Sequence, residues 1–199
     1  KDIAREFAVK SNLPICPGLN NNEIIDENLE KKCSDIGYPI LVKASAGGGG
    51  IGMQIANNFD HLVEAIEKTK NSAEKAFGNN DIFLEKFIAN ARHIEIQVFG
   101  FGKKGAIHCY ERDCSIQRRF QKIIEESPAP DIENSIVQEM SECAVNFATN
   151  QHYEGAGTVE FIYDIDEKKF YFLEMNTRIQ VEHPVTEVIT NLDLVEMQI

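Results

Sequence analysis

The chain has 199 residues, of which 43% are hydrophobic and 26% charged, and its formal net charge at pH 7 is −12. This composition is typical of a globular protein that is long enough to bury a core. The negative charge argues against a nucleic-acid-binding surface, because phosphate backbones require clustered lysine and arginine side chains. No apolar stretch approaches the ~20 residues that span a membrane. Neither nucleic acid nor a membrane is therefore an expected partner.

The cysteines are odd in number, widely spaced and without a CxxC pair: Cys16, Cys33, Cys109, Cys114 and Cys143. This pattern favours reduced thiols over a disulfide framework or a zinc site. It predicts a cytoplasmic protein, or one of the mitochondrial matrix if the source is eukaryotic.

The spacing of apolar residues predicts helices over residues 2–10, 23–36, 58–77 and 135–151. The second should end at Gly37 and the third at Gly78, because glycine is common just after a helix. Strands are expected over 81–88, 93–100 and 106–113, and in 93–100 strict alternation separates Ile94 and Ile96 from Glu95. Two further strands, 158–164 and 170–176, form a hairpin. The last residues, NLDLVEMQI, predict a helix beginning at Asp193, and we expect the chain to be cut from a longer polypeptide at both ends.

Four consecutive glycines, Gly47 to Gly50, follow an apolar run that ends in Lys43, and a second short apolar run, MQIA, follows Gly52. Glycine lets backbone N–H groups approach a ligand closely, and a fixed lysine adds positive charge. This strand–loop–strand segment therefore predicts a phosphate-binding flap. A flexible linker is the alternative, although linkers are usually longer and flanked by polar residues.

The glycine loop fits neither common nucleotide-binding fingerprint. Gly47, Gly49 and Gly52 spell GxGxxG, but a Rossmann turn needs a helix to begin within the loop, and a strand follows instead. A Walker A loop needs a lysine where Ile51 stands. The remaining interpretation is a hinged flap of the ATP-grasp type.

The hairpin predicts a metal site. If its turn is centred near Glu167, antiparallel pairing places Glu160 opposite Glu174, and Asn176 follows on the same face. Such hard oxygen donors suit Mg²⁺ or Mn²⁺ bridging to ATP phosphates. The alternative is a solvated acidic strand, but like charges directly opposite each other are destabilising without a cation. A register shift of one residue would undo the pairing.

Two polar clusters flank the hairpin. They are RRFQK, with Arg118, Arg119 and Lys122, and NTRIQVEHP, with Arg178, Gln180, Glu182 and His183. Basic groups suit an anionic substrate and the charge that develops in phosphoryl transfer, and a glutamate beside them could act as a general base. By themselves these residues also fit an ordinary polar surface.

Together, five segments resemble the ATP-grasp core of a biotin carboxylase, the component of biotin-dependent carboxylases that carboxylates biotin with ATP and bicarbonate. The segments are KASAGGGGIGM, EKFIANARHIEIQV, ERDCSIQRRFQK, GAGTVEFIYD and FLEMNTRIQVEHPVTE. The resemblance implies an α+β, ATP-grasp fold in which two α/β lobes with antiparallel sheets hold ATP between them. Residues 1–199 are then an ATP-grasp fragment, with about 40–125 forming the flap lobe and about 126–199 joining 1–39 in the larger lobe.

The resemblance also assigns roles to individual residues. ATP-binding residues are Lys1, Lys43, Gly47, Gly48, Gly49 and Gly50 at the phosphates, Glu85, Lys86 and Ile88 at the adenine, and His93 and Gln117 around the nucleotide. Metal ligands are Glu160, Glu174 and Asn176. Bicarbonate contacts are Lys122, Arg178, Gln180 and Val181, and the catalytic residues are Lys122, Arg178 and Glu182, the last as the base that deprotonates bicarbonate. The reaction of this ATP-dependent C–N ligase passes through carboxyphosphate.

The implied cofactors and partners are ATP, Mg²⁺ or Mn²⁺, bicarbonate, and biotin on a carrier domain outside this chain. A carboxyltransferase in the same or a partner chain is also implied, as is a homo-oligomer in the full-length form. Phe120 departs from the polar residue usual at its position. Ile51 replaces a usual lysine or arginine, and the GGGGIG flap with EESPAP is closest to urea carboxylases.

Several alternatives remain at this point. The acceptor could be that of an acetyl-CoA, propionyl-CoA or pyruvate carboxylase. A carbamoyl-phosphate-synthetase-type ATP-grasp domain also activates bicarbonate with ATP, although RIQVEHPVTE favours biotin carboxylase. A non-catalytic ATP-binding module is the alternative from another class, and the isolated fragment could be inactive.

Overall fold

The computed structural model describes residues 2–46, 53–119 and 121–199. The predictions for Lys1, the flap glycines Gly47 to Gly50, Ile51 and Phe120 lie outside these residues. The chain divides into a smaller unit, which includes Cys16–Ala89, and a larger unit formed by Ile3–Ile15 and Asn90–Ile199. Each unit has its own sheet and core.

The smaller unit contains a four-stranded antiparallel sheet in the order β1-β4-β2-β3. Its elements are β1 (Gly18–Leu19), α2 (Leu29–Ile36), β2 (Ile40–Ala44), β3 (Gln54–Ala56), α3 (Phe59–Phe77) and β4 (Ile82–Lys86). Apolar residues of α3, such as Leu62 and Ile66, share one core with Ile40 and Val42 of β2. The alternating burial of β2 leaves Lys43 on the opposite face of the sheet.

The helix predicted over 23–36 begins six residues late, at Leu29. Side chains before it make local hydrogen bonds with the backbone instead. Asn20 Oδ1 accepts from the backbone N–H of Asn22, and Asp26 Oδ1 accepts from that of Asn28. Such bonds offer the backbone an alternative to helix, so these residues form turns. The predicted helix end at Gly37 is confirmed, and its φ of 84° is one that glycine adopts readily.

The larger unit contains a five-stranded antiparallel sheet in the order β7-β6-β5-β8-β9. Its elements are α1 (Asp2–Lys10), β5 (Ala91–Phe101), η1 (Gly102–Lys104), β6 (Ala106–Arg118), β7 (Gln121–Glu126), α4 (Asn134–Asn150), β8 (Glu154–Asp164), β9 (Lys169–Asn176), α5 (His183–Thr190) and η2 (Glu196–Gln198). The predicted lobes divide the chain at other points, because β5 pairs with both β6 and β8, and residues 90–125 therefore belong to this unit.

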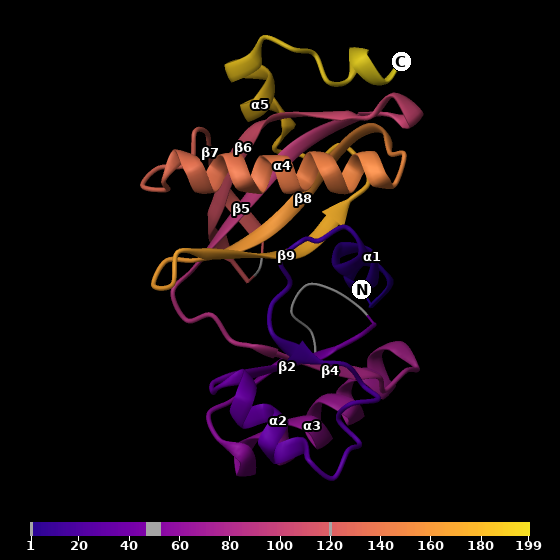
Figure 1. Ribbon diagram of the computed structural model, residues 1–199, viewed down its shortest axis with the longest axis vertical. Helices are drawn as coiled ribbons and strands as arrows, with labels where there is room; N and C mark the ends of the chain where they lie inside the picture. Colours follow the sequence, from indigo (N-terminus) through magenta and orange to yellow (C-terminus); the bar gives the residue numbers. More distant parts are fainter. Residues whose placement is uncertain (1, 47–52, 120) are drawn as a thin grey trace. The chain divides into compact units, whose positions relative to one another are not determined.

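The two faces of the five-stranded sheet differ in chemistry. Helix α4 runs across one face (Figure 1), where Met140 and Phe147 pack with Ile94, Ile96 and Phe161. The opposite face carries charged and polar residues that are also buried: Glu95, Gln97, Arg112, Thr158 and Glu160. Buried charges need partners, so this face requires a network of ion pairs.

At the chain's end, the helix predicted to begin at Asp193 is wrong. A single 3₁₀ turn, η2, forms there instead. The mixed class of helices with antiparallel sheets is as predicted. No helix among the described residues is both long and apolar enough to cross a membrane. All five cysteines are free thiols.

Candidate active site

A row of charged residues crosses four adjacent strands of the larger unit. Arg112 of β6 pairs with Glu95 of β5, Glu95 pairs with Glu160 of β8, and Glu160 pairs with Glu174 of β9. Residues paired directly across strands point to the same face. Three carboxylates therefore stand side by side, with one guanidinium at the end of the row.

The pairing of Glu160 with Glu174 depends on a bulge in β9. The pairs nearest the turn, from Asp164–Lys169 to Phe161–Phe172, would by themselves continue to place Leu173 opposite Glu160. A register shift skips Leu173 and brings Glu174 opposite Glu160. The predicted pair is confirmed, although the four pairs nearest the turn are centred between Asp166 and Glu167 and reach the predicted register only beyond the bulge.

Lys122 of β7 lies among three carboxylates. Its Nζ is 2.5 Å from Glu95 Oε2, 2.9 Å from Glu160 Oε1 and 2.6 Å from Glu182 Oε1. The lysine side chain is 16% exposed and the three glutamates are 8% exposed or less. These short contacts in a buried site make Lys122 the shared cation of the cluster.

The cluster shifts the pKa of each of its three main groups. Burial raises the pKa of Glu160, but hydrogen bonds and charges from His93 and Lys122 outweigh burial and lower it to about 2. Burial also raises the pKa of Glu182, and the hydrogen bond from Lys122 brings it below its usual range. Burial lowers the pKa of Lys122, but Glu95 and Glu160 raise it well above its usual value. The lysine is thus charged and both glutamates ionised at neutral pH.

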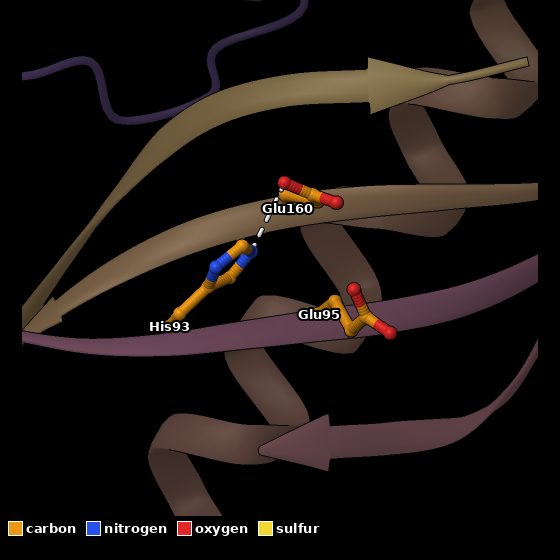
Figure 2. Close-up of side chains that lie close together, drawn as sticks. All are labelled: His93, Glu95 and Glu160. Carbon is orange, nitrogen blue, oxygen red and sulfur yellow. Dashed lines mark ion pairs between the residues drawn. The ribbon is translucent and has the colours of Figure 1, made fainter. Parts of the chain in front are cut away.

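His93 and Gln117, which were predicted to surround the nucleotide, lie beside this cluster. Figure 2 shows His93 of β5 directed at Glu160 of β8, with His93 Nε2 3.0 Å from Glu160 Oε2. Gln117 Nε2 donates to the carbonyl of Cys114 at 2.8 Å and lies 2.7 Å from His93 Nδ1. Because the amide nitrogen is the donor, we infer that Nδ1 accepts and that Nε2 carries the proton towards Glu160.

Gln180 and Asn176 also reach Glu160. Asn176 Nδ2 donates to Glu160 Oε1 at 2.9 Å, and Gln180 Nε2 donates to the same oxygen at 3.2 Å. Gln180 is 7% exposed, and its Oε1 accepts no hydrogen bond among the described residues. A buried acceptor without a hydrogen-bond partner lowers the stability of the fold, so this oxygen is suited to a ligand that donates a hydrogen bond.

The donor set fits a divalent cation at the Glu174 end of the row. Four carboxylates (Glu95, Glu160, Glu174 and Glu182) face two cations (Arg112 and Lys122), which leaves the cluster at −2 when the imidazole is counted as neutral. Carboxylate and amide oxygens are the ligands that Mg²⁺ and Mn²⁺ prefer. Among the described residues, His93, Glu95 and Glu160 also lie close enough to share an ion, but Lys122 already contacts two of them.

In the smaller unit, two predicted ATP-binding residues contact each other. Lys43 Nζ of β2 lies 2.5 Å from Glu85 Oε2 of β4, and both side chains are nearly buried. Lys43 also lies 5.5 Å from the centre of the Phe83 ring. These contacts hold the ammonium group of Lys43 in one position. A lysine that is already ordered loses less conformational entropy on binding a phosphate than a mobile surface lysine does. The predicted adenine-contacting residue Ile88 is 8% exposed.

Two of the predicted bicarbonate-binding residues, Arg178 and Val181, are exposed. Arg178 donates from Nη1 to the carbonyl of Ile179 at 3.1 Å. Val181 is 92% exposed, so its side chain is open to solvent. Glu182 follows as the residue just before α5.

The sequence reasoning missed two parts of the site. Arg112 and Glu95 were not singled out, although the alternation of 93–100 with a neighbouring ERD strand could have indicated a buried charged face. Helix α5 was missed as well, although Pro184 at its start is a common helix-start signal. Its buried Thr186 contacts Arg112, with 2.5 Å between Thr186 Oγ1 and Arg112 Nη1.

Solved biotin carboxylase structures resemble the fold of this chain. The biotin carboxylase of Campylobacter jejuni in a β-γ-ATP complex superimposes with a TM-score of 0.88 and 42% identity, over 98% of this chain and 44% of that chain. The biotin carboxylase domain of Hydrogenobacter thermophilus 2-oxoglutarate carboxylase, a dimer with MgADP, ADP and bicarbonate, gives 0.86 and 45% over 97% of this chain and 42% of that chain. These likenesses confirm the ATP-grasp fold.

The family follows from the sequence as a whole. The model for the carbamoyl-phosphate synthase L chain, ATP binding domain, matches residues 1–199, and the chain belongs to that family. Biotin carboxylase 1 of Bacillus subtilis (strain 168) is 50% identical over all of this chain and 44% of its own length. The chain thus spans less than half of the relatives it matches.

Proposed function

We propose that this chain is the ATP-binding domain of a biotin carboxylase, which carboxylates biotin with ATP and bicarbonate. The observation that carries the proposal is the contact of Lys122 with Glu182 at 2.6 Å, beside the buried, unpartnered Oε1 of Gln180. The relatives named biotin carboxylase support it, and one related structure holds bicarbonate and MgADP. The presence of both ligands in that related structure supports activation of bicarbonate by ATP.

Bicarbonate carries both a negative charge and a proton, and the cluster offers partners for each. In the proposal, Lys122 and Arg178 bind its negative oxygens, because both are cationic; Arg178 is exposed and the Lys122 side chain is 16% exposed. The single hydroxyl hydrogen of bicarbonate lies between Gln180 Oε1, which has no other donor among the described residues, and the carboxylate of Glu182, and both oxygens accept from it before the proton is transferred. Val181 contributes through its backbone, since its side chain is exposed.

Glu182 then acts as the general base. Its carboxylate takes the proton from bicarbonate, and a bicarbonate oxygen attacks the γ-phosphorus of ATP. The bond from that phosphorus to the β–γ bridging oxygen breaks, giving ADP and carboxyphosphate. Carboxyphosphate breaks into CO₂ and phosphate, the phosphate takes the proton of the ureido nitrogen of biotin, and that nitrogen attacks CO₂.

The contact with Lys122 lowers the pKa of Glu182 and so makes it a weak base. In the proposed reaction, bicarbonate takes over part of the hydrogen bonding of Lys122. The loss of that hydrogen bond raises the basicity of Glu182 when the substrate is present.

For ATP, we propose phosphate contacts by Lys43, Lys1 and Gly47 to Gly50, adenine contacts by Glu85, Lys86 and Ile88, and contacts around the nucleotide by His93 and Gln117. Glu160, Glu174 and Asn176 would hold Mg²⁺ or Mn²⁺, which neutralises phosphate charge when bound. The net charge of −2 in the described cluster supports a divalent ion there.

The final acceptor and the partners are also proposals. The flap sequence favours urea carboxylase, whereas the relatives carry the names biotin carboxylase and 2-oxoglutarate carboxylase. A biotin carrier, a carboxyltransferase and a homo-oligomeric full-length form are proposed as partners, and the related dimer supports the last. Free cysteines favour a reducing compartment such as the cytoplasm.

The test is ATP cleavage by the full-length protein with bicarbonate, with and without free biotin. Stimulation by biotin is the expected result. Formation of carbamoyl phosphate with ammonia would instead identify a carbamoyl-phosphate-synthetase-type domain, and ATP binding without cleavage would identify a non-catalytic module.

A further inference from the structure

Arg112 is a fully buried cation on the polar face, at the β6 end of the charged row. Its exposed fraction is 0%, as are those of Glu95, Thr158 and Thr186. Its Nε donates to Glu95 Oε1 at 2.6 Å, and its Nη1 donates to Gln97 Oε1 at 2.9 Å and Thr186 Oγ1 at 2.5 Å. A guanidinium is always charged in proteins and presents donors in a rigid fork, so these partners are fixed in direction.

The first connection from Arg112 leads to the cation of the site. The two carboxylate oxygens of Glu95 have different donors: Oε1 accepts from Arg112, and Oε2 accepts from Lys122 Nζ at 2.5 Å. A fully buried carboxylate is costly without partners, so Arg112 keeps Glu95 charged and its second oxygen directed at Lys122. Lys122 in turn contacts Glu182.

The second connection leads to the base of the site. Thr186 lies in α5, and Glu182 is the residue immediately before that helix. The bond from Arg112 to Thr186 therefore ties the first turn of α5 to the sheet. Arg112 thus holds both Lys122, through Glu95, and Glu182, through α5.

We propose that Arg112 and Thr186 are positioning residues for the Lys122–Glu182 pair. They set the distance between the bicarbonate-binding cation and the base while touching neither substrate, because both are buried. This inference rests on the proposed function. A base displaced by about 1 Å can lose on the order of 10²-fold in rate, so a remote contact can control turnover.

Thr186→Val is the sharpest test, because Arg112→Met would leave Glu95 unpaired and endanger folding. Valine keeps the shape of threonine and removes only the acceptor for Arg112. In the full-length protein we expect kcat of bicarbonate-dependent ATP cleavage to fall about 10- to 100-fold, with the KM for ATP unchanged. Thr186→Ser, which keeps the hydroxyl, should restore most of kcat.

Thr69→Val is the matched control. Thr69 is also a buried helical threonine, 1% exposed, but its hydroxyl has no hydrogen-bond partner among the described residues. It lies in the smaller unit and should lose no activity. Equal losses in Thr186→Val and Thr69→Val, no rescue by Thr186→Ser, or a change confined to the KM for ATP would overturn the inference.

A crystal structure of Thr186→Val separates this inference from the proposed function. The inference requires a longer Lys122–Glu182 distance with the Glu95–Lys122 contact kept, and an unchanged distance overturns it whatever the activity. Absence of bicarbonate-dependent ATP cleavage in the unaltered full-length protein would instead overturn the proposed function.

Discussion

Glu160 of β8 stands directly opposite Glu174 of β9, one position beyond the bulge at Leu173. Two carboxylates paired in this way repel each other. Lys122 contacts Glu160, and no contact between Lys122 and Glu174 is among the described ion pairs. Glu174 is therefore the carboxylate of the row that most needs a cation from outside the chain.

Glu174→Gln should reduce ATP cleavage by the full-length protein at least about 100-fold, because a lost ligand weakens the metal ion that offsets phosphate charge. Mn²⁺ binding, followed by electron paramagnetic resonance, should weaken as well. Without metal, the free energy of unfolding measured in urea should be unchanged or slightly higher, since the repulsion between residue 174 and Glu160 is relieved. Glu167→Gln in the turn of the same hairpin is the control. Normal turnover of Glu174→Gln at limiting Mg²⁺ would exclude the metal assignment.

Lys122→Met should lower the free energy of unfolding by about 3–5 kcal/mol at pH 7, because it leaves buried carboxylates without their shared cation. The deficit should shrink as the pH is lowered, since protonation then removes the unpaired charge. Urea unfolding at several pH values measures both effects. Lys68→Met removes an exposed helical pair with Glu64 and should cost less than about 1 kcal/mol. A similar cost for both variants would show that the cluster is not held by Lys122.

Glu160 makes acid stability a direct readout of its contacts. Its pKa is lowered from 4.5 to about 2 in the folded chain, so it stabilises the fold above pH 4.5. That contribution, on the order of 3 kcal/mol, is lost as the pH falls from 4.5 towards 2. Urea unfolding in the presence of a chelator should show this loss, and Glu160→Gln should flatten it. An identical pH dependence in Glu160→Gln would contradict the assigned contacts.

Lys43→Met should weaken ATP binding about tenfold or more, because a charge-assisted contact with a phosphate is lost. Calorimetric titration of the full-length protein with a non-hydrolysable ATP analogue measures the change. Lys32→Met, which removes the more exposed pair with Asp26 in the same unit, is the control. Equal affinities of Lys43→Met and the unaltered protein would remove Lys43 from the ATP site.

The hairpin shows how far the sequence could predict the site. The predicted strands 158–164 and 170–176 lie within β8 and β9, although β8 begins earlier, at Glu154, and the predicted Glu160–Glu174 pair is confirmed. The bulge at Leu173 was not predictable, because pairing register depends on packing as well as on turn length. The pairs nearest the turn would by themselves place Leu173 opposite Glu160, and the bulge then moves the pairing on by one residue. The two offsets cancel, so Glu174 stands opposite Glu160 as predicted.

The polar face was harder to predict. Glu95 and Arg112 are 17 residues apart along the chain and meet only when β5 pairs with β6. Their burial also contradicts the usual exposure of charged residues, so composition gave no indication of it. The predicted start of α2 was wrong for a local reason, because the side chains of Asn20 and Asp26 accept hydrogen bonds from nearby backbone N–H groups.

The central claim is that Glu182 deprotonates bicarbonate, and Glu182→Gln tests it most directly. Bicarbonate-dependent ATP cleavage with free biotin should fall by at least about 100-fold in the full-length variant, because glutamine cannot accept the proton. ATP affinity should be almost unchanged, because Lys43 and the Glu160–Glu174 pair remain. Weakened ATP binding with normal turnover at saturation would contradict the account and make Glu182 a nucleotide-site or structural residue.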